Sequence, residues 1–281
     1  MGLEKGPGST FLASPHATLS DTEFQRFRTL VLESTGITLS DLKKALVMSR
    51  LGSRLRHRKI NSFSEYYRIL MDPKEGDELQ AAIDLITTNE TSFFREPSHF
   101  EFLRSHLKSL RPVPFPFRVW SAASSSGEEA YTLAMVLSDC LGQADWEILG
   151  TDISTRVLER ARRALYPMER SGSIPKEYLT KYCLKGSGRH EGMFLIDRQL
   201  RARATFMQAN LCQPLPEIGI FDVVFLRNVL IYFAPPEKRL VVEAIARRIK
   251  PGGILMIGHS ETLAGISDRF KPIQPTVYRA L

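Results

Sequence analysis

Polar side chains follow three apolar segments of this sequence, each at the point where a β-strand is expected to end. Two glutamates follow a run of small residues at 121–127, Asp152 closes the next apolar segment, and Arg227 and Asn228 close a third. In an open parallel sheet, ligands bind beyond the carboxyl ends of the strands. We therefore expect these side chains to meet in one ligand site.

The loop at 121–127 indicates what kind of ligand this site would take. Its small residues let the backbone approach a ligand at a helix N-terminus, but the GxGxxG dinucleotide fingerprint is missing. Glu128 and Glu129, which start the next helix, would repel a pyrophosphate and would suit a ligand that carries a cationic amino group. Each glutamate could instead serve only to compensate the helix dipole.

Two further strand ends carry polar groups suited to a nucleoside. An acidic residue in the position of Asp152 usually binds ribose hydroxyls, although it could also cap the helix expected from Ser154. Asn210 and Leu211 follow a later strand and could present amide and backbone groups to an adenine edge. Asparagine is also a common turn former, so this signal is weak alone.

The elements that would position these residues alternate between strands and helices. This βα alternation predicts a parallel sheet with helices on both faces. A glycine-spaced stretch at about 171–206 interrupts it and predicts a small antiparallel insertion. We expect strands at 118–121, 146–150, 221–226 and 254–258, and helices at 128–141, 154–165 and 236–249.

The first third of the chain has a different pattern. Residues 1–20 lack periodicity and predict a flexible tail, whereas residues 21–86 carry several capped, amphipathic helical segments. Alternate prolines near residue 114 favour an extended connection. We therefore expect a helical domain at 21–86, a linker with an active-site motif at 87–117, and an α/β domain at 118–281 that contains the insertion.

Composition narrows the class of protein. The 281 residues are 43% hydrophobic and 25% charged, which is typical of a globular chain. No stretch approaches the ~20 apolar residues that cross a bilayer, and the N-terminus lacks a signal-peptide pattern. Three cysteines, far apart in sequence, give neither a disulfide framework nor a paired metal motif. We expect a cytoplasmic protein that is not inserted in a membrane.

The net charge of +7 favours a polyanionic partner, such as nucleic acid, anionic lipid or an acidic protein surface. Much of this charge lies between positions 41 and 59, where Arg50, Arg54 and Arg58 fall on one stripe of a helix. We expect the stripe to dock an acidic partner. The alternative is an ordinary solvated face.

Four motifs in order resemble one family, the chemotaxis receptor methyltransferases (CheR), within the class I S-adenosylmethionine-dependent methyltransferases. They are TTNETSFFRE at 87–96, WSAASSSGEEAY at 120–131, RNVLIYF at 227–233 and GHSE at 258–261. The match spans nearly everything after residue 20. Ala130 departs from the family pattern, which often has proline there, in a first helical turn where proline is merely tolerated.

The resemblance implies a class I, Rossmann-like methyltransferase domain with a small antiparallel β insertion, preceded by a small all-α domain. It also implies methyl transfer from S-adenosyl-L-methionine to glutamate side chains of chemoreceptor cytoplasmic domains, with S-adenosyl-L-homocysteine as the product. A glutamate of pKa about 4.3 is already an anion at neutral pH, so transfer needs neither a general base nor a metal. We expect a monomer.

The resemblance also implies roles for individual residues. Arg95 and Tyr232 would meet the substrate, since a guanidinium binds carboxylates in a fixed fork. Arg95 could instead serve only the carboxylate of the cofactor. The residues implied to line the cofactor are Asn89, Thr91, Arg95, Glu129, Asp152, Asn210, Leu211, Arg227 and Asn228.

The turn of the insertion suggests a second receptor contact. Gly186, Gly188 and Gly192 resemble, in spacing, the turn of those family members that tether to a C-terminal pentapeptide of the receptor. An extended peptide can add to the free edge of a small sheet. The alternative is a surface hairpin with no partner.

Two other functions compete with this interpretation. A nucleic-acid methyltransferase would share the cofactor fold and explain the positive charge, but residues 227–230 read Arg-Asn-Val-Leu in place of the Asn/Asp-Pro-Pro-aromatic motif usual for base methylation. We therefore expect no nucleic-acid partner. A non-catalytic signalling scaffold would be favoured by loss of Asp152 or Arg95, and both are present.

Overall fold

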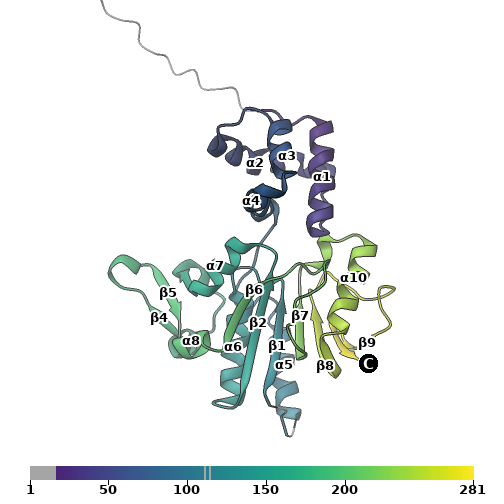
Figure 1. Cartoon of the computed structure of the whole chain (residues 1–281). Helices are drawn as coiled ribbons and strands as arrows, with labels where there is room; N and C mark the ends of the chain where they lie inside the picture. Colours follow the sequence, from purple (N-terminus) through teal and green to yellow (C-terminus); the bar gives the residue numbers. More distant parts are fainter. Residues whose placement is uncertain (1–16, 111, 114) are drawn as a thin grey trace, which may run out of the picture.

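The computed structural model describes residues 17–110, 112–113 and 115–281. Most of the predicted tail at 1–20, and part of the proline-rich stretch, therefore lie outside the described residues. A helical domain sits above an α/β domain, at one end of its central sheet (Figure 1). None of the described helices combines the length and the apolar character needed to cross a bilayer.

The helical domain consists of α1 (Asp21–Thr35), α2 (Lys44–Arg58), α3 (Phe63–Leu70) and α4 (Gly76–Ile86). Ser20 starts α1 in a reciprocal capping box with Glu23, which satisfies two backbone donors that a helix start leaves free. Gly36 ends α1 in the left-handed region, at φ 76°. Phe27 packs in the centre of the domain, edge-on against Phe63 and Tyr67. The domain therefore has a hydrophobic core of its own.

The α/β domain is built on a seven-stranded sheet with the order β6-β2-β1-β7-β8-β10-β9. The first five strands in this order run parallel, and β10 and β9 add an antiparallel edge. The order reverses between β1 and β7, so the cleft beyond their carboxyl ends is where a ligand is expected. The strands are β1 (Phe117–Ala122), β2 (Trp146–Asp152), β6 (Ala204–Gln208), β7 (Phe221–Leu226), β8 (Ile249–Ile257), β9 (Phe270–Gln274) and β10 (Val277–Ala280).

Helices cover both faces of this sheet, as the βα alternation predicted. Buried side chains of α5 (Ser98–Ser109), α6 (Glu128–Leu141) and α7 (Thr155–Arg163) form one hydrophobic cluster with the strands, and α10 (Pro235–Ala246) contributes to another. The fold is the expected class I methyltransferase arrangement with a small antiparallel sheet and a preceding all-α domain.

Two local predictions differ from the structure in this domain. The stretch predicted as a linker contains α5, whose residues Phe100, Leu103 and Leu107 repeat at helical spacing and are buried. The helix predicted to reach residue 249 ends at Ala246, and Lys250-Pro251-Gly252-Gly253 belongs to β8. Gly252 has a φ of 78°, which lets the strand accommodate an irregular pairing register with β7.

The insertion is a three-stranded antiparallel sheet, as predicted, with the order β3-β5-β4. It holds β3 (Leu165–Pro167), α8 (Lys176–Tyr182), β4 (Cys183–Lys185) and β5 (Met193–Ile196), and α9 (Arg198–Arg201) follows. The range predicted for the insertion, about 171–206, was wrong at its end, because β6 (Ala204–Gln208) belongs to the main sheet. Gly150 of β2 leaves room for β6 beside it. A Cβ at this position would lie 2.5 Å from the ring of Phe206, its partner on β6.

Asp84 of α4 connects the helical domain to the α/β domain by capping α7. Its carboxylate accepts hydrogen bonds from the Thr155 amide (2.9 Å), the Thr155 hydroxyl (2.8 Å) and the Arg156 amide (3.3 Å). Ser154, at the N-cap position itself, makes no side-chain capping bond. A carboxylate from another domain thus supplies the acceptors that a helix start requires.

We expect Asp84→Ala to lower the free energy of unfolding by about 1–3 kcal/mol, because it removes a cap and leaves buried donors unpaired. Urea denaturation followed by circular dichroism measures this. Asp77→Ala, an exposed aspartate on the same helix, is the matched control and should change stability by less than about 0.5 kcal/mol. Equal effects of the two substitutions would contradict the capping role.

Candidate functional site

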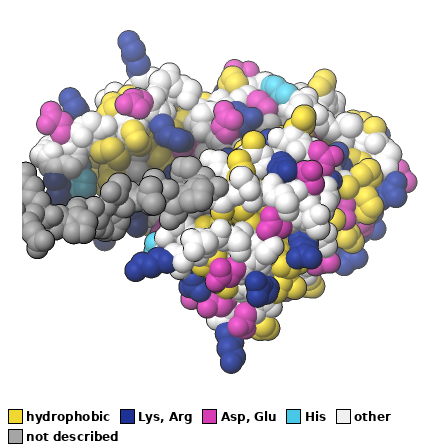
Figure 2. Space-filling view, turned by 90° about the horizontal axis from the view of Figure 1, so that it is seen from above, with side chains coloured by type: hydrophobic (Ala, Val, Ile, Leu, Met, Phe, Trp, Pro, Cys, Tyr) yellow, Lys and Arg dark blue, Asp and Glu magenta, His cyan; other side chains and the backbone are white. Residues whose placement is uncertain are grey.

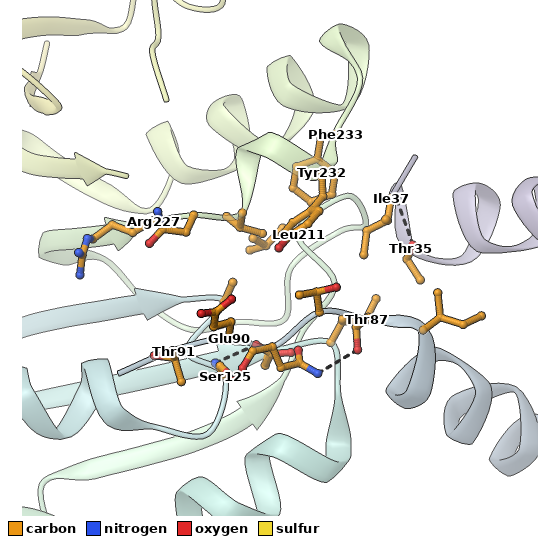
Figure 3. Close-up of a pocket in the computed structure, with 18 of the residues that line it drawn as sticks. Thr35, Ile37, Thr87, Glu90, Thr91, Ser125, Leu211, Arg227, Tyr232 and Phe233 are labelled. Carbon is orange, nitrogen blue, oxygen red and sulfur yellow. Dashed lines mark hydrogen bonds between the residues drawn. The ribbon is translucent and has the colours of Figure 1, made fainter. Parts of the chain in front are cut away.

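A cleft of about 1200 Å³, including its open mouth, lies where the carboxyl ends of β1, β2 and β7 meet the helical domain (Figure 3). All the residues predicted for the cofactor and substrate line it, although they lie as far apart in sequence as Asn89 and Tyr232. They are Asn89, Thr91, Arg95, Glu129, Asp152, Asn210, Leu211, Arg227, Asn228 and Tyr232.

Asp152 fixes the loop that follows β1. One carboxylate oxygen accepts a hydrogen bond from the Ser125 amide and the other from the Ser154 amide, both at 2.9 Å. Burial raises the pKa of Asp152, while these backbone hydrogen bonds act in the opposite direction. A carboxylate has about four acceptor positions, so capacity remains for ligand hydroxyls at the cleft. Asp152 therefore holds the loops after β1 and β2, whereas Asp84 caps α7, and Asp152 keeps acceptor capacity for the predicted contact with a ligand.

Glu129 faces the cleft from the first turn of α6, and Arg227 holds it in place. The Arg227 guanidinium donates to Glu129 at 2.8 Å and to Glu96 at 2.9 Å, forming a buried ion triad, and the Ser121 hydroxyl donates to the other Glu129 oxygen at 2.7 Å. Burial opposes ionisation of Glu96, but the hydrogen bond and charge of Arg227 outweigh it and lower the pKa of Glu96 to about 2.

The triad shows how Arg227, which is predicted to line the cofactor, is held beside the cleft. Its guanidinium points away from the cleft (Figure 3), and its side chain is only 2% exposed. Arg227 therefore acts through Glu129. Sequence reasoning missed Glu96, the third member of the triad, although it is the last residue of the first motif.

Glu261 holds the backbone of the turn after β7. It accepts hydrogen bonds from the amides of Asn228 (2.9 Å), Gly258 (2.6 Å) and Ile231 (3.3 Å), and burial raises its pKa. Gly258 is required by the close approach, since a Cβ there would lie 2.5 Å from the Asn228 side chain. Glu261 stands in the fourth motif, but its sequence position gave no indication of this role.

Arg95 and Tyr232 mark the other side of the cleft. Arg95 is half-buried and donates one hydrogen bond, to the Glu90 carbonyl at 3.0 Å. Among the hydrogen bonds within the described residues, this is the one that its guanidinium makes, so further N–H groups can bind an anion. Tyr232 is half-buried too, and burial raises its pKa, so its hydroxyl is a neutral donor.

The helical domain supplies one wall of the cleft, which the sequence did not reveal. Thr35, Ile37, Leu39 and Lys43 line it. Across the boundary, the Thr38 amide donates to the Tyr232 carbonyl at 2.9 Å.

Asn210 belongs to this same boundary. Its amide donates to the Ser34 carbonyl at 2.9 Å, and its oxygen accepts from the Cys212 amide at 2.9 Å. The side chain of Asn210 thus helps to hold the domains together, and the second N–H of its amide has no partner among the hydrogen bonds of the described residues.

The three arginines of the predicted docking stripe share one face of α2, but they turn toward α4. Arg54 makes a bidentate pair with Glu78 (2.8 and 2.6 Å), and Arg58 pairs with Glu75 at 3.0 Å. Arg50 donates to the Ile86 carbonyl at 2.7 Å. Carboxylates and carbonyls distant in sequence therefore engage these cations, although Arg58 remains exposed, and the docking role of the stripe stays a prediction.

The glycines of the insertion shape the loop between β4 and β5. Gly188 and Gly192 have left-handed φ angles of 57° and 77°, and a Cβ on Gly186 would lie 2.1 Å from the His190 carbonyl. This hairpin projects from the side of the α/β domain (Figure 1). Its strand β4 is a sheet edge, with Leu184 53% exposed.

Comparisons with known proteins agree with this architecture. Residues 22–87 match the family description "CheR methyltransferase, all-alpha domain", and residues 89–279 match "CheR methyltransferase, SAM binding domain". The chain is 38% identical to the chemotaxis protein methyltransferase of Escherichia coli, over 92% of this chain and 91% of that protein.

Other relatives are similar over nearly their whole length. The chemotaxis protein methyltransferase of Salmonella typhimurium is 36% identical over 98% of this chain and 96% of that protein. The chemotaxis protein methyltransferase 2 of Pseudomonas aeruginosa is 37% identical, with 94% of each chain covered. With its two matched domains in the order and fold described, the chain belongs to the CheR methyltransferase family, whose cofactor is S-adenosylmethionine.

Proposed function

We propose that this methyltransferase of chemotaxis modifies glutamate side chains of chemoreceptor cytoplasmic domains, forming γ-glutamyl methyl esters. The observation that supports this most is the position of Arg95, whose guanidinium has free donors on the same cleft as Glu129 and Asp152. A fixed cation beside the cofactor cleft suits an anionic side chain as the acceptor of the methyl group. The protein would work in the cytoplasm, where these receptor domains lie.

The residues of the cleft fit the cofactor. Small residues at 121–127 leave room for backbone approach, Glu129 offers a carboxylate to a cationic amino group, and Asp152 retains acceptor capacity for ribose hydroxyls. When bound, S-adenosylmethionine supplies an activated methyl group on a sulfonium. Arg227 keeps the Glu129 carboxylate oriented for that amino group, since the two side chains form an ion pair at 2.8 Å.

The remaining work of the protein is positioning. A substrate glutamate is ionised at neutral pH, so no residue has to remove a proton from it. Arg95 would orient the carboxylate in line with the methyl group, and Tyr232 would add a hydrogen bond from the half-buried wall of the cleft. If Arg95 binds the carboxylate of the cofactor instead, Tyr232 becomes the principal contact to the substrate.

A nucleic-acid substrate has less support. Lys and Arg side chains on the face seen in Figure 2 are interspersed with acidic ones and do not gather in one basic patch. Several of the arginines that give the chain its positive charge are also committed to internal pairs. Nucleic-acid binding relies on a continuous basic surface.

The free edge of β4 supports a second receptor contact, with a C-terminal peptide. An extended pentapeptide could add to this edge through main-chain hydrogen bonds. Docking through the stripe of Arg50, Arg54 and Arg58 would rely mainly on Arg58, which is exposed, with Arg56 and Lys59 as further exposed cations of the same segment.

Incubation with radiolabelled S-adenosylmethionine and a receptor cytoplasmic fragment tests the reaction. We expect label in the receptor that mild base releases as methanol, because esters are base-labile and N-methyl groups are not. A receptor fragment with the candidate glutamates changed to alanine is the control. Base-stable label, or label transferred to nucleic acid offered in the same assay, would overturn the proposed substrate.

Arg95→Ala should lower methyl transfer by at least about 100-fold, the loss typical of a removed charged contact to the reacting group, and Tyr232→Phe should lower it less. Rates on a receptor fragment, with circular dichroism as a check of folding, measure this. Arg163→Ala, whose side chain is 73% exposed on α7, is the matched control and should retain the wild-type rate. Wild-type rates in both cleft variants would refute the assignment of the substrate end.

The peptide contact predicts that a receptor ending in an acidic, aromatic-containing pentapeptide binds more tightly than the same receptor truncated by five residues. Shortening the loop at 186–192 should abolish the difference, because it disturbs the edge strand, while binding of S-adenosylhomocysteine persists. Calorimetric titration of both receptors measures it. Equal affinity of the two receptors for the wild-type protein would leave the hairpin without this partner.

A further inference from the structure

A second group of chemically capable side chains lies outside the cleft, on the other side of the ion triad. Glu96, His99 and His259 come from the loop before α5, from α5 and from the turn after β8. Their ligand atoms all lie within 4.8 Å of one another, and among the described residues this is the one group of three or more histidines, cysteines or carboxylates that meets this condition. None of the three residues lines the cleft.

The distances match those around a metal ion. Nδ1 of His99 lies 3.5 Å from the Glu96 carboxylate, and Nε2 of His259 lies 3.9 Å from the same oxygen. In tetrahedral coordination with bonds of about 2.1 Å, ligand atoms are roughly 3.4 Å apart. His99 and Glu96 already have this spacing. His259 has a 53% exposed side chain, and its Nε2 also lies 3.3 Å from the Ser98 hydroxyl.

One of the two ring nitrogens of His99 has a hydrogen-bond contact. Nε2 lies 2.8 Å from the hydroxyl oxygen of Thr276, and that hydroxyl donates its single hydrogen to the Pro275 carbonyl at 2.7 Å. In the tautomer with the proton on Nε2, the Thr276 hydroxyl accepts this hydrogen bond and Nδ1 presents a lone pair. A hydrogen bond on the second nitrogen is typical of metal-binding histidines.

The Nδ1 lone pair has an unusual position. His99 is 1% exposed, and its Nδ1 has no hydrogen-bond partner among the described residues. It faces a carboxylate oxygen, which is also an acceptor. In the tautomer with a lone pair on Nδ1, this nitrogen and the oxygen, which also accepts from Arg227, are both acceptors, and a cation between them removes their repulsion.

We propose that Glu96, His99 and His259 bind a divalent transition-metal cation. Two imidazoles and one carboxylate favour zinc and its neighbours, such as cobalt(II) and nickel(II), over magnesium or calcium, which prefer oxygen ligands. His259 opens the site to solvent. Arg227 also holds Glu96, at 2.9 Å, and such a hydrogen bond to a ligating carboxylate is compatible with metal binding.

The proposed ion takes no part in the methyl transfer argued above, which needs no metal. Its position nevertheless gives it a connection to the cofactor cleft. Glu96 is shared between the ion and Arg227, and Arg227 orients Glu129. Binding of the ion would therefore act on the side chain that holds the cofactor end of the site.

Titration of the full chain with cobalt(II) chloride tests the proposal, because tetrahedral cobalt(II) absorbs visibly through d–d transitions. We expect a saturable absorption at one equivalent for the wild-type protein. His259→Gln, on an exposed side chain that folding does not require, should weaken binding by at least about tenfold. His57→Gln, which removes an exposed histidine on α2, is the matched control and should bind cobalt as the wild type does.

A second variant separates a site from surface binding. Thr276→Val removes the hydrogen-bond partner of His99 Nε2 and should also weaken cobalt binding, with the fold checked by circular dichroism. The proposal is overturned if the wild-type protein gives no saturable absorption. It is also overturned if His259→Gln binds cobalt as tightly as the wild type, since binding would then arise elsewhere on the chain.

Discussion

The buried ion triad of Glu96, Arg227 and Glu129 is the interaction on which the rest of the site depends. A guanidinium is permanently charged, so an Arg227 side chain that is 2% exposed must be surrounded by carboxylates and acceptors. Satisfying it brings together the loop before α5, the first turn of α6 and the end of β7. Separating the partners would leave a buried charge unpaired, which is costly in free energy. The three side chains therefore hold one another in place.

Carboxylates hold the backbone in three other places around the cleft. Asp152 binds the amides of the loop after β1, Glu261 binds those of the turn after β7, and Asp84 caps α7 from the helical domain. Each loop is thus fixed by an acceptor that lies elsewhere in sequence. The acidic residues of this site position its backbone. Those that have unused acceptor positions can also contact a ligand.

The helical domain completes the cleft and does not merely precede it. Residues after α1 line one wall, the Thr38 amide meets the Tyr232 carbonyl, and Asn210 reaches the Ser34 carbonyl. A ligand in the cleft would therefore contact both domains, and its binding would depend on how they are held together. The same domain pairs some of its arginines internally, as Arg54 pairs with Glu78.

The sequence determined the alternation of strands and helices, the place of the cleft and most of the residues that line it. It could do so because apolar periodicity is local, and because polar residues at strand ends converge in any parallel sheet. Only the tertiary structure decided that Arg227 turns away from the cleft, that Arg54 faces Glu78, and that β6 joins the main sheet. These outcomes depend on partners 24 to 131 residues away, such as Glu78 for Arg54 and Glu96 for Arg227, and no local pattern specifies such pairings.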